Sequence, residues 1–255
     1  MITFSQLGRY GRFANQLFQI AGTIGLATKH GYSYAFPKWI NYDHKDRFGS
    51  TEDVDLQKYF VNPLPASDIN LPDFPISWGY HPDMRIPDGV SLSGHMQSEK
   101  YFKHCKDVIQ HYFAMKEEDS FEDFVAIHVR LGDYDNQYHT RLDQSYYARA
   151  IEQFPPATKF VVFSDDPLAA AMIIATSTYA SHSGGLHAAP KQSYFEDFRM
   201  MKRCGGFICG NSSFSLMAAI LSPAKKKKIV CPSQWFGPAW TPETKDLYPE
   251  NAIII

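Results

Sequence analysis

The sequence has no surplus of either charge and few cysteines. Its 255 residues carry 25 Lys and Arg against 27 Asp and Glu, which gives a formal net charge of −2. So small a charge provides no general attraction for nucleic acid, and an anionic ligand has to be held by a local group of positive charges. The four cysteines, Cys105, Cys204, Cys209 and Cys231, lack a C-x-x-C spacing. They indicate neither a zinc site nor a disulfide framework, and we expect reduced, buried thiols.

Long apolar runs are also missing. Residues 1–7 have neither the basic region nor the apolar core of a signal peptide, and no stretch approaches the roughly 20 apolar residues of a membrane helix. We therefore expect a cytoplasmic protein. One basic run, Lys225–Lys228, precedes the apolar residues 229–231. A solvated loop entering a strand is the simpler interpretation of this run, and weak peripheral contact with an anionic membrane is the alternative.

The overall amino-acid composition is that of a globular protein. Hydrophobic residues make up 44% and charged residues 20%, which is too apolar for a disordered chain. The length fits one large domain or two domains of roughly 100–150 residues each. Aromatic residues reach 15%. Most of them suit a core, although carbohydrate sites also use aromatic faces.

The amino-terminal part has the pattern of a β-α-β unit. Residues 2–7 are expected to form a strand, residues 13–30 a helix, and residues 32–36 the next strand. Gly31 is placed to end the helix, because glycine accepts the left-handed conformation of a helix cap. Residues 37–90 contain many prolines and aspartates and are expected to form loops and small elements that shape an acceptor surface.

A second domain is expected after an acidic stretch. Residues 97–115 are predicted to be a helix, and the acidic residues that follow it place a domain boundary between 1–117 and 118–255. Strands and helices alternate in the second part, which predicts an α/β fold with a parallel sheet covered by helices on both faces. The expected strands are 124–129, 159–163, 206–209 and 228–231, and the expected helices are 143–153, 167–174, 192–203 and 213–221.

Three of the predicted strands end in residues that suit an anionic ligand. Arg130 follows the first strand, Asp165 and Asp166 follow the second, and residues 210–215 follow the third. Ligands of open parallel sheets bind beyond the carboxyl ends of the strands, where loops and helix N-termini direct their N–H groups outward. We therefore expect the three loops to meet at one ligand.

Each loop has a functional and a structural interpretation. Arg130 offers a planar fork that suits bidentate binding of phosphate, and an ion pair with Asp133 is the structural alternative. The run Asn211–Ser215 places hydroxyls and N–H groups at a helix start, which is either an anion site or simple N-capping. Either aspartate, Asp165 or Asp166, can cap the helix that begins at Pro167, and a carboxylate there can also accept from the paired donors of guanine.

No metal site is predicted. Asp133-Tyr134-Asp135 follows an arginine that is better suited to replacing a cation than to sharing one, and Asp53-Val54-Asp55 stays unassigned in a region expected to be irregular. The loop at residues 8–16 can approach a pyrophosphate, but it does not match G-x-G-x-x-G, which disfavours a dinucleotide fold. A transferase without a metal has to stabilise a departing diphosphate with arginine and helix dipoles.

Five motifs in one order resemble a known family. They are G-x-x-x-N-Q-x-F-Q at 11–19, G-x-x-Q-S-x-x-Y-F at 94–102, H-x-R-x-G-D-Y at 128–134, F-S-D-D at 163–166 and N-S-S-F-S at 211–215. Together they resemble the α-1,2-fucosyltransferases, glycosyltransferase family eleven. The resemblance implies a GT-B-like fold, in which two Rossmann-like domains face a central cleft. It also implies an inverting transfer of fucose from GDP-β-L-fucose to an oligosaccharide or glycoconjugate acceptor, α-1,2 to galactose, with no metal or other cofactor.

The resemblance assigns roles to individual residues. Arg130, Asn15 and Asp133 would be catalytic. The donor would be bound by residues that come from both domains, namely Arg12, Phe13, His128, Asp165, Ser212, Ser213 and Phe214. The loop at 12–15 would close over the sugar diphosphate. The resemblance does not name a base for the acceptor hydroxyl. Asp43, His95 and Glu99 are candidates only as polar residues in loop-like or motif-bearing segments, and a solvated or capping role is the simpler interpretation of each.

The sequence departs from the family pattern at two places. Leu216-Met217 stand where two tryptophans are usual, and Leu131 stands where a second arginine is common. These departures keep two alternatives open. One is a transferase of the same fold that uses another GDP-sugar, and the other is a non-catalytic protein that binds GDP or carbohydrate.

Overall fold

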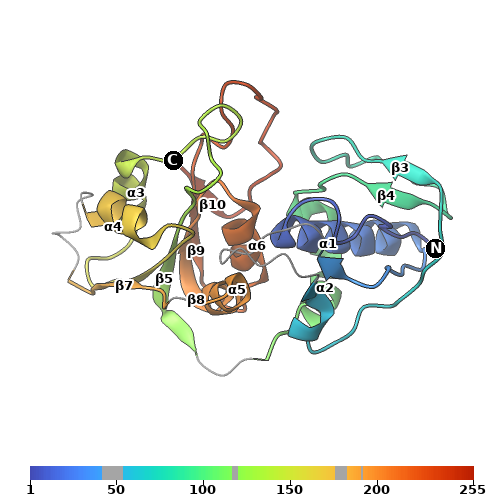
Figure 1. The fold of residues 1–255 in the computed structure, drawn as a ribbon, viewed down its shortest axis with the longest axis horizontal. Coiled ribbons are helices and arrows are strands. Elements are labelled where there is room, and N and C mark those ends of the chain that lie inside the picture. Colours follow the sequence, from blue (N-terminus) through green and yellow to red (C-terminus); the bar gives the residue numbers. More distant parts are fainter. Residues whose placement is uncertain (42–53, 117–119, 176–182, 191) are drawn as a thin grey trace. The chain divides into compact units, whose positions relative to one another are not determined.

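Parallel strands organise both parts of the chain. The computed structural model describes residues 1–41, 54–116, 120–175, 183–190 and 192–255. The chain divides into unit 1, Met1–Glu117 with Glu243–Pro249, and unit 2, Glu118–Pro242 with Glu250–Ile255. Both units combine helices with parallel strand pairings (Figure 1). The predicted α/β class is confirmed.

Unit 2 is built on a six-stranded parallel sheet of order β10-β9-β8-β5-β6-β7. Its strands are β5 (Phe121–Val129), β6 (Lys159–Ser164), β7 (Leu186–Ala188), β8 (Cys204–Ile208), β9 (Lys228–Cys231) and β10 (Ala252–Ile254). The chain proceeds from β5 outward to β7 and then returns to β8 on the other side of β5. The loops after β5 and β8 therefore diverge, and this reversal is where open α/β sheets hold their ligands.

Helices cover both faces of this sheet (Figure 1). One face carries α3 (Gln144–Ile151) and α4 (Pro167–Ala175), and the other carries α5 (Tyr194–Lys202) and α6 (Ser213–Leu221). Because successive side chains of a strand alternate in direction, Val125, Ile127 and Val129 of β5 join the core beneath α3 and α4. His128 of the same strand instead meets Phe214 of α6, with ring centroids 5.6 Å apart.

Unit 1 assembles a parallel ladder from very short segments. β3 (Asp73–Pro75) pairs with β4 (Ser91–Ser93), and single bridges add the segments at Thr3, Tyr34 and Ala66 in turn. All these pairings are parallel. The helix α1 (Phe13–His30) links the segment at Ile2 and Thr3 to the segment at Tyr34, as the β-α-β pattern predicts.

The predicted helix at 13–30 is confirmed at both ends. Gly31 follows it with a φ of 71°, and the Gly31 N–H donates to a carbonyl of the last turn. Inside α1, Gln16 and Gln19 are fully buried. Gln16 Nε2 donates to the Gly11 carbonyl at 2.9 Å, and Gln19 Nε2 donates to the Tyr10 carbonyl at 2.7 Å. Two buried side chains of the helix thus fix the loop that precedes it.

Three elements predicted for unit 1 are wrong, and one of them is the strand expected at 32–36, which pairs only through single bridges at Tyr34 and Phe36. The strand expected at 2–7 pairs only at Ile2 and Thr3, and residues 5–9 form turns. The helix expected at 97–115 is broken into η2 (Glu99–Tyr101), η3 (Lys103–Cys105) and α2 (Lys106–Tyr112). The break has a backbone cause, because Phe102 has a φ of −134° and cannot continue a helix.

Other elements escaped prediction because they are short. The region 37–90 contains β1 (Ile40–Asn41), β2 (Val54–Asp55) and η1 (Leu56–Tyr59) in addition to β3. In unit 2, β7 and β10 are three-residue strands at the two edges of the sheet. Edge strands this short leave little alternation in the sequence to detect.

A late segment of the chain belongs to unit 1. Within Glu243–Pro249, the Glu243 carbonyl accepts from Trp78 Nε1 at 2.8 Å, and the Asp246 carboxylate pairs with Lys100 Nζ at 2.7 Å. In the ranges that the structure describes, no helix has the length and apolar character needed to cross a membrane.

The loop before α1 provides a stability prediction. Gly11 and Gly89 both have a φ of +78°, but a Cβ on Gly11 would lie 2.8 Å from Asn15 Cβ, whereas a Cβ on Gly89 would meet nothing within 4 Å. We expect Gly89→Ala to lower the free energy of unfolding by about 1 kcal/mol through backbone strain alone. Gly11→Ala should lower it by about 2–4 kcal/mol, since crowding adds to the strain. Denaturant unfolding measures both, and equal losses would contradict this account.

Candidate functional site

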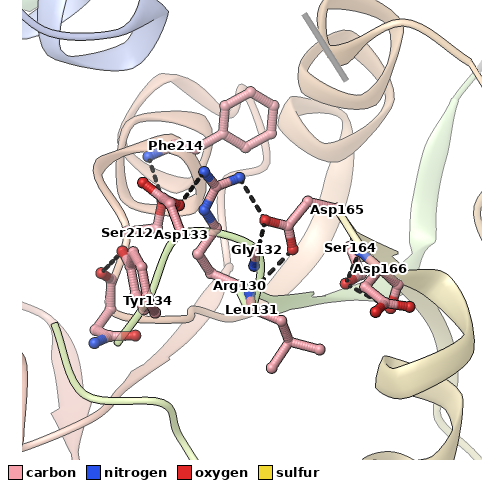
Figure 2. A network of polar contacts seen from close by, with 11 residues as sticks. Arg130, Leu131, Gly132, Asp133, Tyr134, Ser164, Asp165, Asp166, Ser212 and Phe214 are labelled. Carbon is pink, nitrogen blue, oxygen red and sulfur yellow. Dashed lines mark hydrogen bonds and ion pairs between the residues drawn. The ribbon is translucent and has the colours of Figure 1, made fainter. Parts of the chain in front are cut away.

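Arg130 lies at the end of β5 and is held by two carboxylates (Figure 2). Its Nη1 is 2.8 Å from Asp165 Oδ2, and its Nη2 pairs with Asp133 Oδ1. The ion pair with Asp133 that the sequence offered as an alternative is therefore present, together with a second one. The Arg130 side chain is 22% exposed, so it is not sealed off from solvent by its two partners.

Asp165 also holds the backbone beside Arg130. Its Oδ1 accepts from the Leu131 N–H at 3.0 Å, and its Oδ2 accepts from the Gly132 N–H at 2.9 Å. A Cβ on Gly132 would lie 2.7 Å from Oδ2, so this close approach requires glycine. Both oxygens of Asp165 are engaged in these contacts. In this arrangement the carboxylate positions the arginine loop.

The neighbouring aspartate, Asp166, caps a helix instead of binding Arg130. Asp166 Oδ1 accepts from the Ala169 N–H at 3.0 Å and thereby caps α4, which begins at Pro167. The Asp166 N–H donates to Ser164 Oγ at 3.0 Å. The sequence left the capping role open between Asp165 and Asp166, and the structure gives it to Asp166.

The loop after β8 begins helix α6 next to the arginine loop (Figure 2). Ser212 is its N-cap residue, and Ser212 Oγ accepts from the Phe214 N–H at 3.3 Å. The capping interpretation is thus observed, and it is compatible with anion binding because a hydroxyl that accepts one hydrogen bond still has a proton to donate. Ser213 is the first residue of α6, where the helix dipole is positive.

Asn211 locks this loop to its surroundings. It is 1% exposed, and its Nδ2 donates to the carbonyls of Thr140 and Trp235, each at 2.8 Å. The Asn211 carbonyl in turn accepts from the Tyr134 hydroxyl at 2.6 Å. Asn211 and Tyr134 belong to two of the sequence motifs, which assign them no individual role. They join the loops after β5 and β8 on the two sides of the reversal.

His128 adds a neutral polar group on the α6 face of the sheet. It is 6% exposed, and its Nδ1 has no hydrogen-bond partner in the part of the chain that the structure describes. Burial, assisted by the nearby charge of Arg130, lowers the pKa of His128 to about 4. The imidazole is therefore neutral near pH 7. A buried nitrogen without a partner needs an explanation, and a bound ligand is one that the position of His128 at the sheet edge allows.

The predicted residues of the first domain lie in unit 1. Arg12 is the N-cap residue of α1, and Asn15 Oδ1 accepts from Gln97 Nε2 at 2.6 Å, so that the first two motifs meet. Phe13 is 4% exposed, and its ring lies 6.2 Å from that of Trp39. The ring of Phe13 is part of the core of unit 1, so a contact of this residue with the donor, which stays a prediction, would have to come from its backbone.

Asp43 and Glu99 were further candidates, each for a base that activates the acceptor hydroxyl. Asp43 lies outside the described residues, and Glu99 begins η2. Leu216 and Met217 have no exposed surface in α6, so the departure from the usual tryptophans is a change of packing behind the site. Within the described ranges, no group of three or more His, Cys, Asp or Glu side chains is placed to hold a metal ion.

Taken together, the edge of the sheet in unit 2 presents a fixed arginine, a positive helix end and a neutral imidazole. The arginine and the helix end suit the oxygens of a phosphate, and the imidazole suits the polar edge of a base. This chemistry fits a nucleoside diphosphate.

Known proteins show similarity along most of the chain. The family model of glycosyl transferase family 11 matches residues 55–249. The O-antigen biosynthesis glycosyltransferase WbnK of Escherichia coli is 28% identical over 122 residues, which cover 44% of this chain and 39% of that protein. The chain thus matches less than half the length of this curated relative.

Two solved structures share the fold. POFUT1 in complex with GDP superposes with a TM-score of 0.54 at 13% identity, covering 89% of this chain and 96% of that one. The NodZ α-1,6-fucosyltransferase soaked with GDP-fucose superposes with a TM-score of 0.51 at 14% identity, covering 87% and 92%. At such low identities the similarity is one of fold.

The buried His128 leads to a prediction about acid stability. As the pH falls below 6.5, the unfolded state takes up a proton that the folded state accepts only near its pKa of about 4, so stability is lost between these values. We expect the wild type to lose about 2 kcal/mol more than His128→Gln between about pH 7 and about pH 4.5. Denaturant unfolding of both proteins at the two pH values measures this difference. Parallel losses would show that His128 is not held neutral by the fold.

Proposed function

Because this chain belongs to glycosyltransferase family 11, we propose that it transfers L-fucose from GDP-β-L-fucose to a hydroxyl of a glycan acceptor, with inversion at C1 of the sugar. The finer part of the proposal is an α-1,2 linkage to galactose. The two fold relatives support the donor, since one is in complex with GDP and the other was soaked with GDP-fucose. Unit 2 is the proposed GDP-sugar-binding part and unit 1 the acceptor side.

The observation that carries the proposal is the setting of Arg130. Asp165 fixes both its guanidinium and the adjoining backbone, at the point where the order of the sheet reverses. A diphosphate can take the place of Asp133, which is 46% exposed, while Asp165 stays in position. The planar fork then binds two phosphate oxygens, and the start of α6 contributes N–H groups and the Ser212 and Ser213 hydroxyls.

The reaction follows from where charge develops. The acceptor oxygen bonds to C1 of fucose as the bond from C1 to the β-phosphate oxygen breaks, and the hydroxyl proton passes to a base or to solvent. Positive charge grows on the sugar ring and negative charge on the departing phosphate. Arg130 and the α6 end stabilise the departing phosphate, a form of catalysis that depends on donors fixed in advance.

The guanine side of the site is assigned to His128 and Phe214. The neutral imidazole offers a hydrogen-bond donor and an acceptor, and its Nδ1 lacks a partner among the residues described. Phe214 lies against this ring and is partly exposed. Asp165 supports the site indirectly, through its contacts with the arginine loop.

One structural feature favours a second candidate, a transferase for another GDP-sugar. Leu216 and Met217 are fully buried residues of α6, whose start belongs to the proposed donor site, so their packing can alter the shape of that site. Hydrolysis of GDP-fucose and of GDP-mannose in parallel separates the two donors. A protein that binds GDP in calorimetry but transfers to no glycan of a broad array would instead be a non-catalytic binder.

Arg130 provides the direct test of the function. Arg130→Ala should reduce turnover with GDP-fucose by about 10²–10³-fold, in line with the loss of one preorganised donor to a developing anion. Arg130→Lys keeps the charge without the planar fork, and its turnover should lie between that of the wild type and that of Arg130→Ala. Arg149→Ala, an exposed arginine of α3, serves as the matched control and should retain turnover. Near-normal turnover of Arg130→Ala would rule out the proposed role.

The metal-independent mechanism is tested separately. If arginine and the helix end stabilise the diphosphate, transfer measured after treatment with EDTA should stay within about twofold of the untreated rate. Restoration of a lost rate by added Mg²⁺ or Mn²⁺ would contradict the mechanism. It would leave the fold and the family assignment unchanged.

A further inference from the structure

A stacked pair of rings joins two loops of unit 1. The rings of Tyr10 and His95 have centroids 4.7 Å apart and planes inclined by 26°. Tyr10 follows the segment at Ile2 and Thr3, and His95 follows β4, the neighbour of that segment in the parallel ladder. The pair therefore lies at the carboxyl edge of the ladder, where parallel strands present their ligand-binding loops.

Partly buried hydrogen bonds to α1 hold both loops in place. Gln19 Nε2 donates to the Tyr10 carbonyl at 2.7 Å, from a side chain with no exposed surface. The loop after β4 is tied to the same helix, because Gln97 Nε2 donates to Asn15 Oδ1 at 2.6 Å. Two polar side chains of α1, the buried Gln19 and the half-buried Asn15, thus fix the loops that carry the two rings.

The backbone around His95 is strained. Met96 has a φ of 48°, and such a left-handed conformation of a non-glycine residue costs about 1–3 kcal/mol. Gly94 has a φ of 133°, and a Cβ there would lie 2.5 Å from the Ile76 carbonyl oxygen. His95 is thereby presented in an orientation that regular backbone would not give.

The imidazole of His95 is stacked on Tyr10, and one of its two nitrogens has no polar partner among the described residues. Its Nδ1 is buried without a hydrogen bond to any residue that the structure describes, and burial lowers the pKa of His95. A neutral imidazole has one donor and one acceptor nitrogen, which matches the hydroxyl group of a sugar. An unpaired buried polar atom costs about 1–3 kcal/mol, which a bound hydroxyl would recover.

A second stacked pair of rings in unit 1 shares some of the features of the Tyr10 and His95 pair and lacks others. His30 and Tyr32 also stack, with centroids 5.7 Å apart, and His30 Nε2 is likewise buried without a partner among the described residues. This pair lies at the carboxyl end of α1, away from the strand ends. It lacks the strained backbone and the glutamine bond to the loop. A stacked pair is therefore not a site by itself, and the His30 pair provides a matched control.

The geometry points to Tyr10 and His95 as a binding subsite for the galactoside of the acceptor. The ring of Tyr10, 36% exposed, would contact the C–H face of the sugar, and the imidazole would bond to one of its hydroxyls. Galactose suits this pair because its axial hydroxyl leaves adjacent C–H groups together on one face, where an aromatic ring can pack. The assignment rests on the proposed function, to which it adds the acceptor contacts.

Binding of a simple galactoside tests the subsite without requiring turnover. The probe is methyl β-D-galactopyranoside, observed by saturation-transfer NMR with the full chain, with and without GDP. We expect the wild type to bind it, and His95→Phe and Tyr10→Ala each to weaken binding by about tenfold, through loss of a hydrogen bond or of the aromatic contact. His30→Phe should bind like the wild type.

Further variants separate a binding defect from a folding defect. Tyr10→Phe keeps the ring and should bind within about twofold of the wild type, while His95→Gln keeps a polar group and should lose less affinity than His95→Phe. Circular dichroism and the affinity for GDP, measured by calorimetry, should be unchanged in all of them.

Two outcomes would overturn the subsite. One is a wild type that does not bind the galactoside, and the other is wild-type affinity in both His95→Phe and Tyr10→Ala. Failure of the proposed function would look different, since the wild type would then lack affinity for GDP or hydrolysis of GDP-fucose. The two proposals can therefore fail independently.

Discussion

The candidate site depends on the carboxylate of Asp165. It binds the Arg130 guanidinium and two successive backbone N–H groups, and so ties the loop after β5 to the end of β6. A charged side chain that follows a buried strand needs such a partner, because an unpaired charge near the core is strongly destabilising. The hydrogen bond from Tyr134 to Asn211 then extends this order to the loop after β8. One carboxylate thereby sets the geometry on both sides of the reversal in the sheet.

The sequence was informative wherever its pattern was long and regular. Alternation of strands and helices predicted the sheet of unit 2, and α1, α6 and β9 match their expected bounds. Because parallel strands end at one edge, the pattern also predicted that Arg130, Asp165 and Ser212 lie near one another. The family that the motifs resemble is the family whose model matches the chain.

Sequence reasoning was weakest where structure depends on single contacts. The segments of unit 1 pair through isolated bridges, so no hydrophobic periodicity of the sequence indicates that Tyr10 and His95 are neighbours. The break of the expected helix at 97–115 reflects the backbone conformation of Phe102, which hydrophobic spacing does not encode. Phe13 was assigned to the donor because its motif resembles a binding loop, yet its side chain is buried.

The unequal exposure of the two partners of Arg130 has a consequence for the catalytic cycle. Asp165 is 17% exposed and fixed by backbone donors, whereas Asp133 is 46% exposed. Under the proposed function, a diphosphate displaces Asp133 and not Asp165, and Asp133 returns to the guanidinium when the diphosphate leaves. The positive charge of Arg130 is then balanced both in the empty site and in the occupied one. Because Asp133 competes with donor and product alike, it lowers the affinity of this contact for both.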